Sequence, residues 1–322
     1  MMDVVALGEL LIDFTMQSAD ADGYPTMAAH PGGAPANFLA ALAKYGKKTA
    51  LIGKVGADAF GGLLLKTLKT AGIDTRGLIA AEDVFTTLAF VTLDAAGDRE
   101  FSFARKPGAD TCIRFDEMDL SLIDEAKIFH FGTLSLTDEP ARGATKQAVA
   151  YAKEKGKLIT YDPNLRKPLW KSLDAAKEQM LWGLCQADVV KISDEEVEFL
   201  FDMKPEEGAK HILDICGAKL VFVTCGAEGC FFMNEKACGH VPALEGVKAI
   251  DTTGAGDIFG GSAVYRLLEM GKAPDELEKD ELQDIVRFAC AAAGLSTQKH
   301  GGISSVPDRT EVMLHLNEEE LR

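Results

Sequence analysis

The chain has 322 residues, of which 47% are hydrophobic and 26% charged, which is ordinary for a globular protein with a sizeable core. Its formal net charge of -16 disfavours nucleic acid and anionic membranes as partners, because both require a positive surface. No signal segment opens the chain, and no apolar run is long enough to span a membrane. We therefore expect a cytoplasmic protein with neither a nucleic acid nor a membrane as partner.

The cysteines and histidines suggest no metal site. The 7 cysteines include no C-x-x-C pair, and the 6 histidines form no H-E-x-x-H motif. We expect reduced, mostly buried thiols, with no disulfide framework and no structural zinc.

Short β-branched runs alternate with helical stretches along the chain. Strands are expected near residues 4, 49, 127, 157, 188 and 219. Helices are expected over residues 35–45, 59–71, 138–155, 174–186, 194–201, 206–216 and 280–297, and from residue 258 onward. This alternation predicts an α/β fold, with a central, mostly parallel sheet covered by helices on both faces. No linker divides the chain, so we expect one domain over residues 1–322.

Two segments interrupt the alternation. Residues 86–105 read as two strands around a turn, and residues 11–30 look extended with no helical pattern. We expect a small β lid built from about residues 11–30 and 84–106. The lid is also the expected contact of a homodimer.

The segment DTTGAGD, residues 251–257, joins a glycine turn to a helix. Gly254 and Gly256, with only Ala255 between them, let the backbone approach an anion, and the free N–H groups of the helix start face the same point. Asp257 is unusual in a phosphate site unless it handles a proton. An N-capping aspartate after a glycine loop is the alternative. No Walker motif occurs and no G-x-G-x-x-G follows the first strand, which disfavours a Walker ATPase and a Rossmann dehydrogenase.

A second glycine segment lies near the N-terminus, in GGAPANF. Gly32 and Gly33 allow a turn to pass close to a ligand, Pro35 starts a helix, and Asn37 offers donors and acceptors to hydroxyl groups. A tight turn with a solvated Asn37 is the alternative. Asp13 follows the first strand, at the edge where α/β sheets bind ligands.

With these two glycine segments in this order, residues 4–307 resemble the sugar kinases of the ribokinase (pfkB) family, and among them most the fructokinases. The resemblance implies a ribokinase-like fold with ATP, Mg²⁺ and often K⁺. It also implies phosphoryl transfer from ATP to the terminal hydroxyl of fructose, giving fructose 6-phosphate. The alternatives are 2-keto-3-deoxygluconate kinase, ribokinase, a nucleoside or aminoimidazole riboside kinase, and a catalytically silent sugar-binding relative.

The resemblance assigns roles at the reacting centre. Asp257 would take the sugar's proton, with a pKa lowered by the helix start, and the N–H groups of Gly254, Ala255 and Gly256 would hold the phosphoryl group. The sugar would lie against residues of the N-terminal and lid segments: Asp13, Gly32, Gly33, Asn37, Phe101, Phe103 and Arg105. Lid packing for the two phenylalanines, and solvation for Arg105, are the alternatives.

The motif D-x-N-x-R is matched by Asp162, Asn164 and Arg166. Their alternation predicts that all three side chains project to one side of an extended segment, with Arg166 on phosphate or sugar and Asn164 on the nucleotide side. Lys191 and Glu196 match the family's pattern around a glutamate that orders magnesium through water. Ser193 replaces the usual asparagine there, and the neighbouring Glu195 is an alternative to Glu196.

Three further groups of residues are assigned by resemblance. Thr224, Gly226 and Gly229 match a loop beside the ATP phosphates, with a hairpin turn as the alternative. Ala292 and Gly294 would make room for adenine, with helix packing as the alternative. A monovalent cation would bind near oxygens from Asp251, Thr253 and Ser305.

Overall fold

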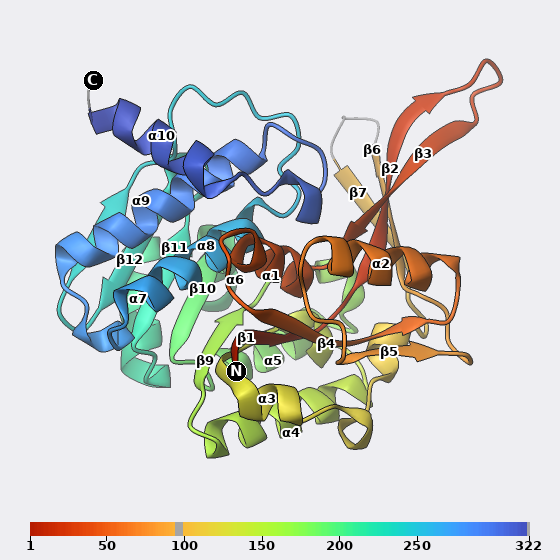
Figure 1. Cartoon of the computed structure of the whole chain (residues 1–322), viewed down its shortest axis with the longest axis horizontal. Helices are drawn as coiled ribbons and strands as arrows, with labels where there is room; N and C mark the ends of the chain where they lie inside the picture. The colour runs from red at the N-terminus through yellow and green to blue at the C-terminus, as the bar shows by residue number, and fades with distance from the viewer. Residues whose placement is uncertain (94–98, 321–322) are drawn as a thin grey trace.

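The computed structural model describes residues 1–93 and 99–320, without the side chains of residues 93–101 and 317–320. Its centre is a nine-stranded sheet in the order β13-β12-β11-β10-β9-β8-β1-β4-β5 (Figure 1). The strands are β1 (Met2–Leu7), β4 (Thr49–Gly56), β5 (Leu78–Ala81), β8 (Ala126–Gly132), β9 (Leu158–Asp162), β10 (Val189–Ser193), β11 (Leu220–Thr224), β12 (Cys230–Asn234) and β13 (Cys238–Val241).

The sheet is parallel from β11 to β5, and β12 and β13 add an antiparallel edge. The central strands are buried on both faces, which explains their continuous apolar sequences. All six expected strands are confirmed. β5, β12 and β13, which have four or five residues each, were not predicted.

Helices cover both faces of this sheet. On one face lie α1 (Ala34–Lys44), α2 (Ala59–Thr70), α8 (Ala255–Met270), α9 (Lys279–Ser296) and α10 (Arg309–Glu320). On the other lie α3 (Ser121–Glu125), α4 (Ala141–Glu154), α5 (Leu173–Leu184), α6 (Asp194–Phe201) and α7 (Pro205–Cys216). The two faces have separate apolar cores, and the predicted fold class is confirmed. Of these helices, α3 and α10 were not predicted.

Local sequence signals set several helix ends. The Asp58 carboxylate accepts hydrogen bonds from the N–H groups of Phe60 and Gly61, so it caps α2. Helix α8 ends at Gly271, whose φ of 64° is left-handed and favours glycine. Helices α1 and α8 pack against each other, so the two glycine segments at their starts lie side by side (Figure 1).

The two segments predicted as extended form a second, four-stranded sheet, which we call the small sheet. Its order is β3-β2-β6-β7, with β2 (Leu11–Ala19), β3 (Pro25–Gly32), β6 (Leu88–Leu93) and β7 (Arg99–Ala104). Strands β2 and β6 run parallel and join the two hairpins. Part of the turn expected between β6 and β7, residues 94–98, lies outside the described residues.

One cysteine prediction is wrong. The structure joins Cys185 and Cys216 in a disulfide, because the C-terminal ends of α5 and α7 bring their Cα atoms to 4.2 Å. Of the other five cysteines, Cys230 and Cys290 are buried, Cys112 and Cys225 are half-buried and Cys238 is exposed. Within residues 1–93 and 99–320, no helix is both long and apolar enough to cross a membrane.

Candidate active site

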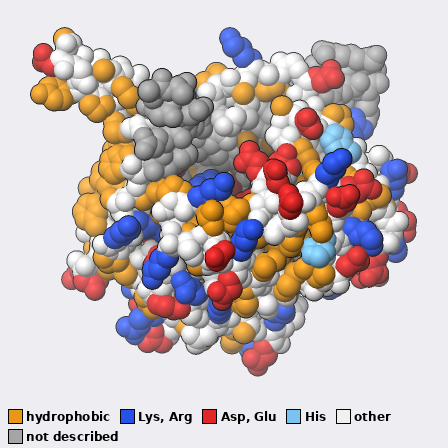
Figure 2. Space-filling view, turned by 180° about the vertical axis from the view of Figure 1, so that it is seen from behind, with side chains coloured by type: hydrophobic (Ala, Val, Ile, Leu, Met, Phe, Trp, Pro, Cys, Tyr) orange, Lys and Arg blue, Asp and Glu red, His pale blue; other side chains and the backbone are white. Residues whose placement is uncertain are grey.

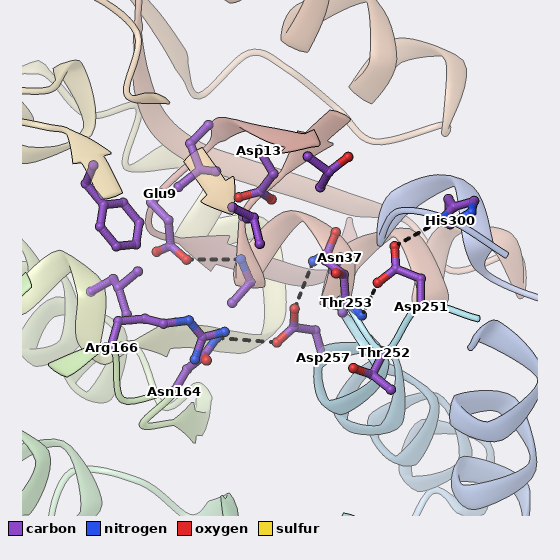
Figure 3. Close-up of a pocket in the computed structure, with 18 of the residues that line it drawn as sticks. Glu9, Asp13, Asn37, Asn164, Arg166, Asp251, Thr252, Thr253, Asp257 and His300 are labelled. Carbon is purple, nitrogen blue, oxygen red and sulfur yellow. Dashed lines mark hydrogen bonds and ion pairs between the residues drawn. The ribbon is translucent and has the colours of Figure 1, made fainter. Parts of the chain in front are cut away.

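A pocket of about 430 Å³ opens between the carboxyl ends of the central strands and the small sheet (Figure 3). Residues from the N-terminal and the C-terminal parts of the chain line it. The predicted residues that line it are Asp13, Gly33, Asn37, Phe103, Asn164, Arg166, Asp251, Thr253, Gly254 and Asp257. Glu9 also lines it, and the sequence did not predict that.

The glycine turn of residues 254–256 forms one wall. Gly254 has a φ of 77°, and the 16-residue helix α8 begins at the next residue. The positive end of the helix dipole and its first N–H groups therefore face the pocket. A Cβ on Gly256 would lie 3.0 Å from Nζ of Lys191, so the Lys191 ammonium sits directly beside the turn. Together these groups make a site for an anion.

Asp257 lies in the first turn of α8 and is held by two amides. Nδ2 of Asn37 donates to its Oδ2 at 2.8 Å, and Nδ2 of Asn164 donates to its Oδ1 at 3.5 Å. Burial raises the pKa of Asp257, although the hydrogen bond from Asn37 and the charges of Lys191 and Arg166 oppose the rise. The expectation of a lowered pKa is wrong, because loss of solvent outweighs the favourable interactions.

Asn37 is wedged between two glycine turns. A Cβ on Gly302 would lie 2.2 Å from its Oδ1, and a Cβ on Gly254 would lie 3.1 Å from its Nδ2. Its buried Oδ1 has no hydrogen-bond partner among the described residues. The amide is thus fixed in orientation by the two turns.

The segment after β9 departs from the predicted alternation. Asn164 has a left-handed φ of 49°, which interrupts the extended conformation that the alternation requires. Asn164 and Arg166 consequently line the pocket, whereas Asp162 is buried beneath it, with Oδ2 3.1 Å from Nζ of Lys191. Burial opposes the charge of Lys191, but the carboxylates of Asp162, Glu196 and Asp257 outweigh it and raise the pKa of Lys191. The lysine is therefore a cation at the turn.

Glu196 is buried below Asn164 and Arg166. Its Oε1 accepts from the N–H of Leu165 at 2.6 Å, and its Oε2 accepts from the N–H of Ser193 at 2.9 Å. The Ser193 hydroxyl accepts in return from the N–H of Glu196, so serine acts here as the cap of α6. Glu195 is exposed. Of the two glutamates, Glu196 is the one next to the pocket.

Asp13 lies on β2, at the side of the pocket formed by the small sheet. A Cβ on Gly32 would lie 2.4 Å from its Oδ2, so only glycine leaves room for this carboxyl group. Burial raises the pKa of Asp13 to about 6, against the charge of Arg166. Gly33 has a φ of 125°, and its Cβ would lie 2.5 Å from the carbonyl oxygen of Glu9. Both glycines are thus required by close approach.

Glu9 follows β1 and is almost fully buried. Its Oε1 accepts from the N–H of Ala34 at 3.0 Å, at the start of α1. An acidic residue at the carboxyl end of a buried parallel strand is the sequence signal that could have identified it.

The three lid residues that were predicted to contact the sugar, Phe101, Phe103 and Arg105, have different positions relative to the pocket. Phe103 lines the pocket, and the side chain of Phe101 lies outside the described residues. Arg105 is not among the lining residues. Its guanidinium is buried, 2.6 Å from Oδ2 of Asp110, and also donates to Thr137. The Asp110 carboxylate thus neutralises the buried guanidinium, and a contact of Arg105 with the substrate stays a prediction.

The residues predicted around a monovalent cation come from two neighbouring segments. Asp251 accepts from the N–H groups of Thr253 at 2.9 Å and Gly301 at 3.1 Å. Ser305 is buried, and its hydroxyl donates to the carbonyl of Gly302 at 2.9 Å. Asp251 and Thr253 line the pocket and Ser305 does not.

Asn164, predicted on the nucleotide side, lines this pocket, whereas the other predicted ATP-binding segments lie outside it. Thr224 ends β11, and Gly226 and Gly229 lie in the turn to β12, an antiparallel hairpin in which both glycines have positive φ. Ala292 is fully buried in the core, and a Cβ on Gly294 would meet Leu244 at 3.1 Å. A second pocket of about 750 Å³ lies between residues 240–245 and α9, and α9 lines it with Cys290 and Ala291 instead.

Comparison with known proteins gives consistent matches over the whole chain. The family model described as "pfkB family carbohydrate kinase" matches residues 1–309. Fructokinase-2 of Solanum lycopersicum is 41% identical, over 97% of this chain and 95% of the relative. A fructokinase from Xylella fastidiosa with bound ATP superposes with a TM-score of 0.91 at 29% identity, covering 99% of this chain and 100% of that one.

A third match carries ligands. A fructokinase double mutant from Vibrio cholerae, in a form with fructose, ADP and potassium ion bound, has a TM-score of 0.85 at 31% identity. It covers 98% of this chain and 98% of its own.

Proposed function

The chain belongs to the pfkB family of carbohydrate kinases, and we propose that it is a fructokinase that transfers the γ-phosphoryl group of ATP to the terminal hydroxyl of fructose. The observation that carries the proposal is the placement of Asp257. It lies in the first turn of α8, is held by Asn37, and faces a pocket with Asp13, Asn37 and Arg166 on its walls. A proton acceptor beside an anion site and a polar pocket suits transfer to a hydroxyl group.

Different residues of the chain have different roles in the phosphoryl transfer. Asp257 accepts the proton of the attacking hydroxyl, and its raised pKa makes it a better base than a solvated carboxylate. The N–H groups of Gly254, Ala255 and Gly256, together with Arg166 and the Lys191 ammonium, hold the negative charge of the transferring group. Asp13 and Asn37 orient the sugar, which matters because positioning supplies much of the rate enhancement.

The donor set fits a magnesium ion held through water. Each carboxylate oxygen of Glu196 accepts one backbone N–H and keeps a second lone pair, which suits a hydrogen bond from metal-bound water. Magnesium, when bound, neutralises charge on the phosphates. We assign potassium to oxygens of Asp251, Thr253 and Ser305, and the turn of Thr224, Gly226 and Gly229 to the ATP phosphates. The groove along α9, which Cys290 and Ala291 help to line beside Ala292 and Gly294, is assigned to the adenine.

A sugar panel tests the function. The purified protein is assayed with ATP and fructose, ribose, 2-keto-3-deoxygluconate and aminoimidazole riboside, and the phosphorylated position is identified by nuclear magnetic resonance. We expect the highest kcat/KM with fructose, and fructose 6-phosphate as product. Higher kcat/KM with another sugar would remove the fructokinase assignment and leave the kinase assignment. No turnover of any sugar would favour a catalytically silent relative.

We also assign the small sheet as a lid and as the contact of a homodimer. Its edge strands β3 and β7 have one side unpaired by any described strand, and Met16 and Tyr24 are exposed on the β2–β3 hairpin. Figure 2 shows hydrophobic side chains along the projecting hairpin, whereas acidic and basic side chains intermingle elsewhere on that face. Light scattering of the wild type and of Met16→Lys measures the mass. A cytoplasmic location stays a prediction from the sequence.

A further inference from the structure

Glu9 is a buried carboxyl group for which the mechanism above has no use. It lies in the turn after β1, and its side chain is 2% exposed. One oxygen, Oε1, accepts from the Ala34 N–H and so caps the start of α1. The other, Oε2, is buried and has no hydrogen-bond partner among the described residues. A buried acceptor without a partner is costly, so it calls for an explanation.

Glu9 forms part of the wall of the sugar pocket. Glu9 is a lining residue together with Asp13, Phe103 and Leu134. Figure 3 shows the Glu9 carboxyl on the side of the pocket away from Asp251 and His300. Glu9 therefore lies across the pocket from Asp251, the residue that opens the DTTGAGD segment (Figure 3).

The carboxyl group of Glu9 is held in a fixed position. The carbonyl oxygen of Glu9 would be 2.5 Å from any Cβ on Gly33, and the Ala34 bond fixes the carboxyl plane. A ligand hydroxyl would thus meet an acceptor that is already oriented, at no further cost in side-chain freedom. Burial raises the pKa of Glu9 to about 7, so the group can also carry a proton near neutral pH and then donate.

We propose that Oε2 of Glu9 binds a hydroxyl group of the sugar at the end opposite the transferred one, and that Glu9 is a specificity-determining residue of this site. The inference rests on the proposed sugar kinase function. It extends that function by assigning recognition of the remote end of the sugar to a residue separate from Asp13 and Asn37. Sugars that lack the hydroxyl leave Oε2 unpaired and are rejected.

The test compares fructose with its 1-deoxy, 3-deoxy and 4-deoxy analogues in the wild type and in Glu9→Gln. Glutamine keeps the shape and the acceptor for Ala34, and replaces the free oxygen by an amide. We expect KM for fructose to rise about ten- to a hundredfold, with kcat at saturating sugar changed less than about threefold. Discrimination against one deoxy analogue should collapse to within about threefold, while discrimination against the others persists.

Two further variants distinguish a direct contact between Glu9 and the sugar from a purely structural role of Glu9. Glu195→Gln makes the same chemical change at an exposed site, and its kinetics should match the wild type. Glu9→Asp retains the carboxyl group but withdraws it by one methylene, and should also weaken discrimination if Oε2 touches the sugar. Thermal unfolding of all variants with and without fructose monitors the fold.

The outcomes are distinct for the two proposals. If Glu9→Gln and Glu9→Asp keep every deoxy discrimination ratio of the wild type, Glu9 only caps α1 and the inference is overturned. If another sugar is preferred, the fructokinase assignment falls and the deoxy series of that sugar decides the role of Glu9 by the same ratio. If no sugar turns over, calorimetric sugar affinities supply the ratio, and absence of sugar binding overturns both proposals.

Discussion

Nδ2 of Asn37 donates a hydrogen bond of 2.8 Å to Oδ2 of Asp257, which lies 220 positions later in the chain. In the proposed function, this bond joins the residue that orients the sugar to the residue that takes its proton. It also opposes the rise of the Asp257 pKa that burial causes. The proposal therefore couples sugar recognition to proton transfer through one amide.

Asp257→Asn tests the base directly. Because asparagine cannot accept the proton but fits the same space, we expect kcat to fall by about 10² to 10⁴, the range for a lost general base. ATP affinity and thermal stability, measured as controls, should stay near the wild-type values. Unchanged kcat would exclude Asp257 from proton transfer.

Asn37→Ala should move the pH dependence of activity. Loss of the hydrogen bond removes an interaction that lowers the Asp257 pKa, so that pKa should rise further and the acid limb of the kcat/KM profile should shift to higher pH. Asn164→Gly is the control, since its bond to Asp257 is longer, 3.5 Å, and glycine tolerates the left-handed φ there. If the acid limb of the kcat/KM profile does not shift in Asn37→Ala, the hydrogen bond from Asn37 does not lower the pKa of Asp257.

Gly256→Ala should separate catalysis from stability. A Cβ there meets only the flexible end of Lys191 at 3.0 Å, and alanine in a helix is favoured over glycine by about 1 kcal/mol. We expect an unfolding free energy near or above the wild type, and a kcat at least about tenfold lower because the ammonium is displaced from the anion site.

Gly254→Ala is the contrasting variant. Its φ of 77° and the 2.9 Å approach to the Gly302 backbone should cost stability as well as activity. Equal unfolding free energies in the two variants would show that the turn is not strained as described.

Because of His130, the free energy of unfolding should depend on pH. This histidine is buried, stacked on Phe38 at 3.8 Å and hydrogen-bonded to Thr160, and burial, with the charge of Lys191, lowers its pKa to about 3. Between that value and about 6.5, the ordinary histidine pKa, only the unfolded chain binds the proton. The His130 contribution is thus complete above pH 6.5 and is lost as pH falls, by up to about 1.4 kcal/mol per pH unit.

Urea unfolding of the wild type and His130→Gln from pH 4.5 to 7 measures this contribution. The difference in unfolding free energy should shrink as pH falls, because the other titrating groups cancel in the difference. His240→Gln, at an exposed position, should show no such trend. A pH-independent difference for His130→Gln would mean that the folded protein protonates this histidine normally.

The sequence predicted what local signals determine. The glycine turn before α8, the central strands and the extended segments of the small sheet all follow from residue pattern, and the structure contains them. What it could not predict depends on residues distant in the chain. The left-handed Asn164, the pairing of Arg105 with Asp110, and the exposed ends of α5 and α7 that join Cys185 to Cys216 are examples.

The pKa values of the carboxyl groups in the site were the property that the sequence predicted least well. A carboxylate at a helix start suggests a lowered pKa, but Asp257 is enclosed by Asn37 and other residues from distant segments, and the resulting loss of solvent reverses the direction. Glu9 was missed for a related reason. Its role depends on a free oxygen that only the packing around Ala34 defines.

Most residues that line the pocket come from residues 9–37 near the start of the chain and from residues 250–300 near its end. During synthesis the first group leaves the ribosome long before the second exists. A nascent chain can assemble β1, β4 and the small sheet early, but it has no base and no anion site until α8 has emerged and packed on α1. In the proposed function, prematurely terminated chains therefore lack both the base and the glycine turn of the anion site, so catalysis begins only with molecules whose synthesis is nearly finished.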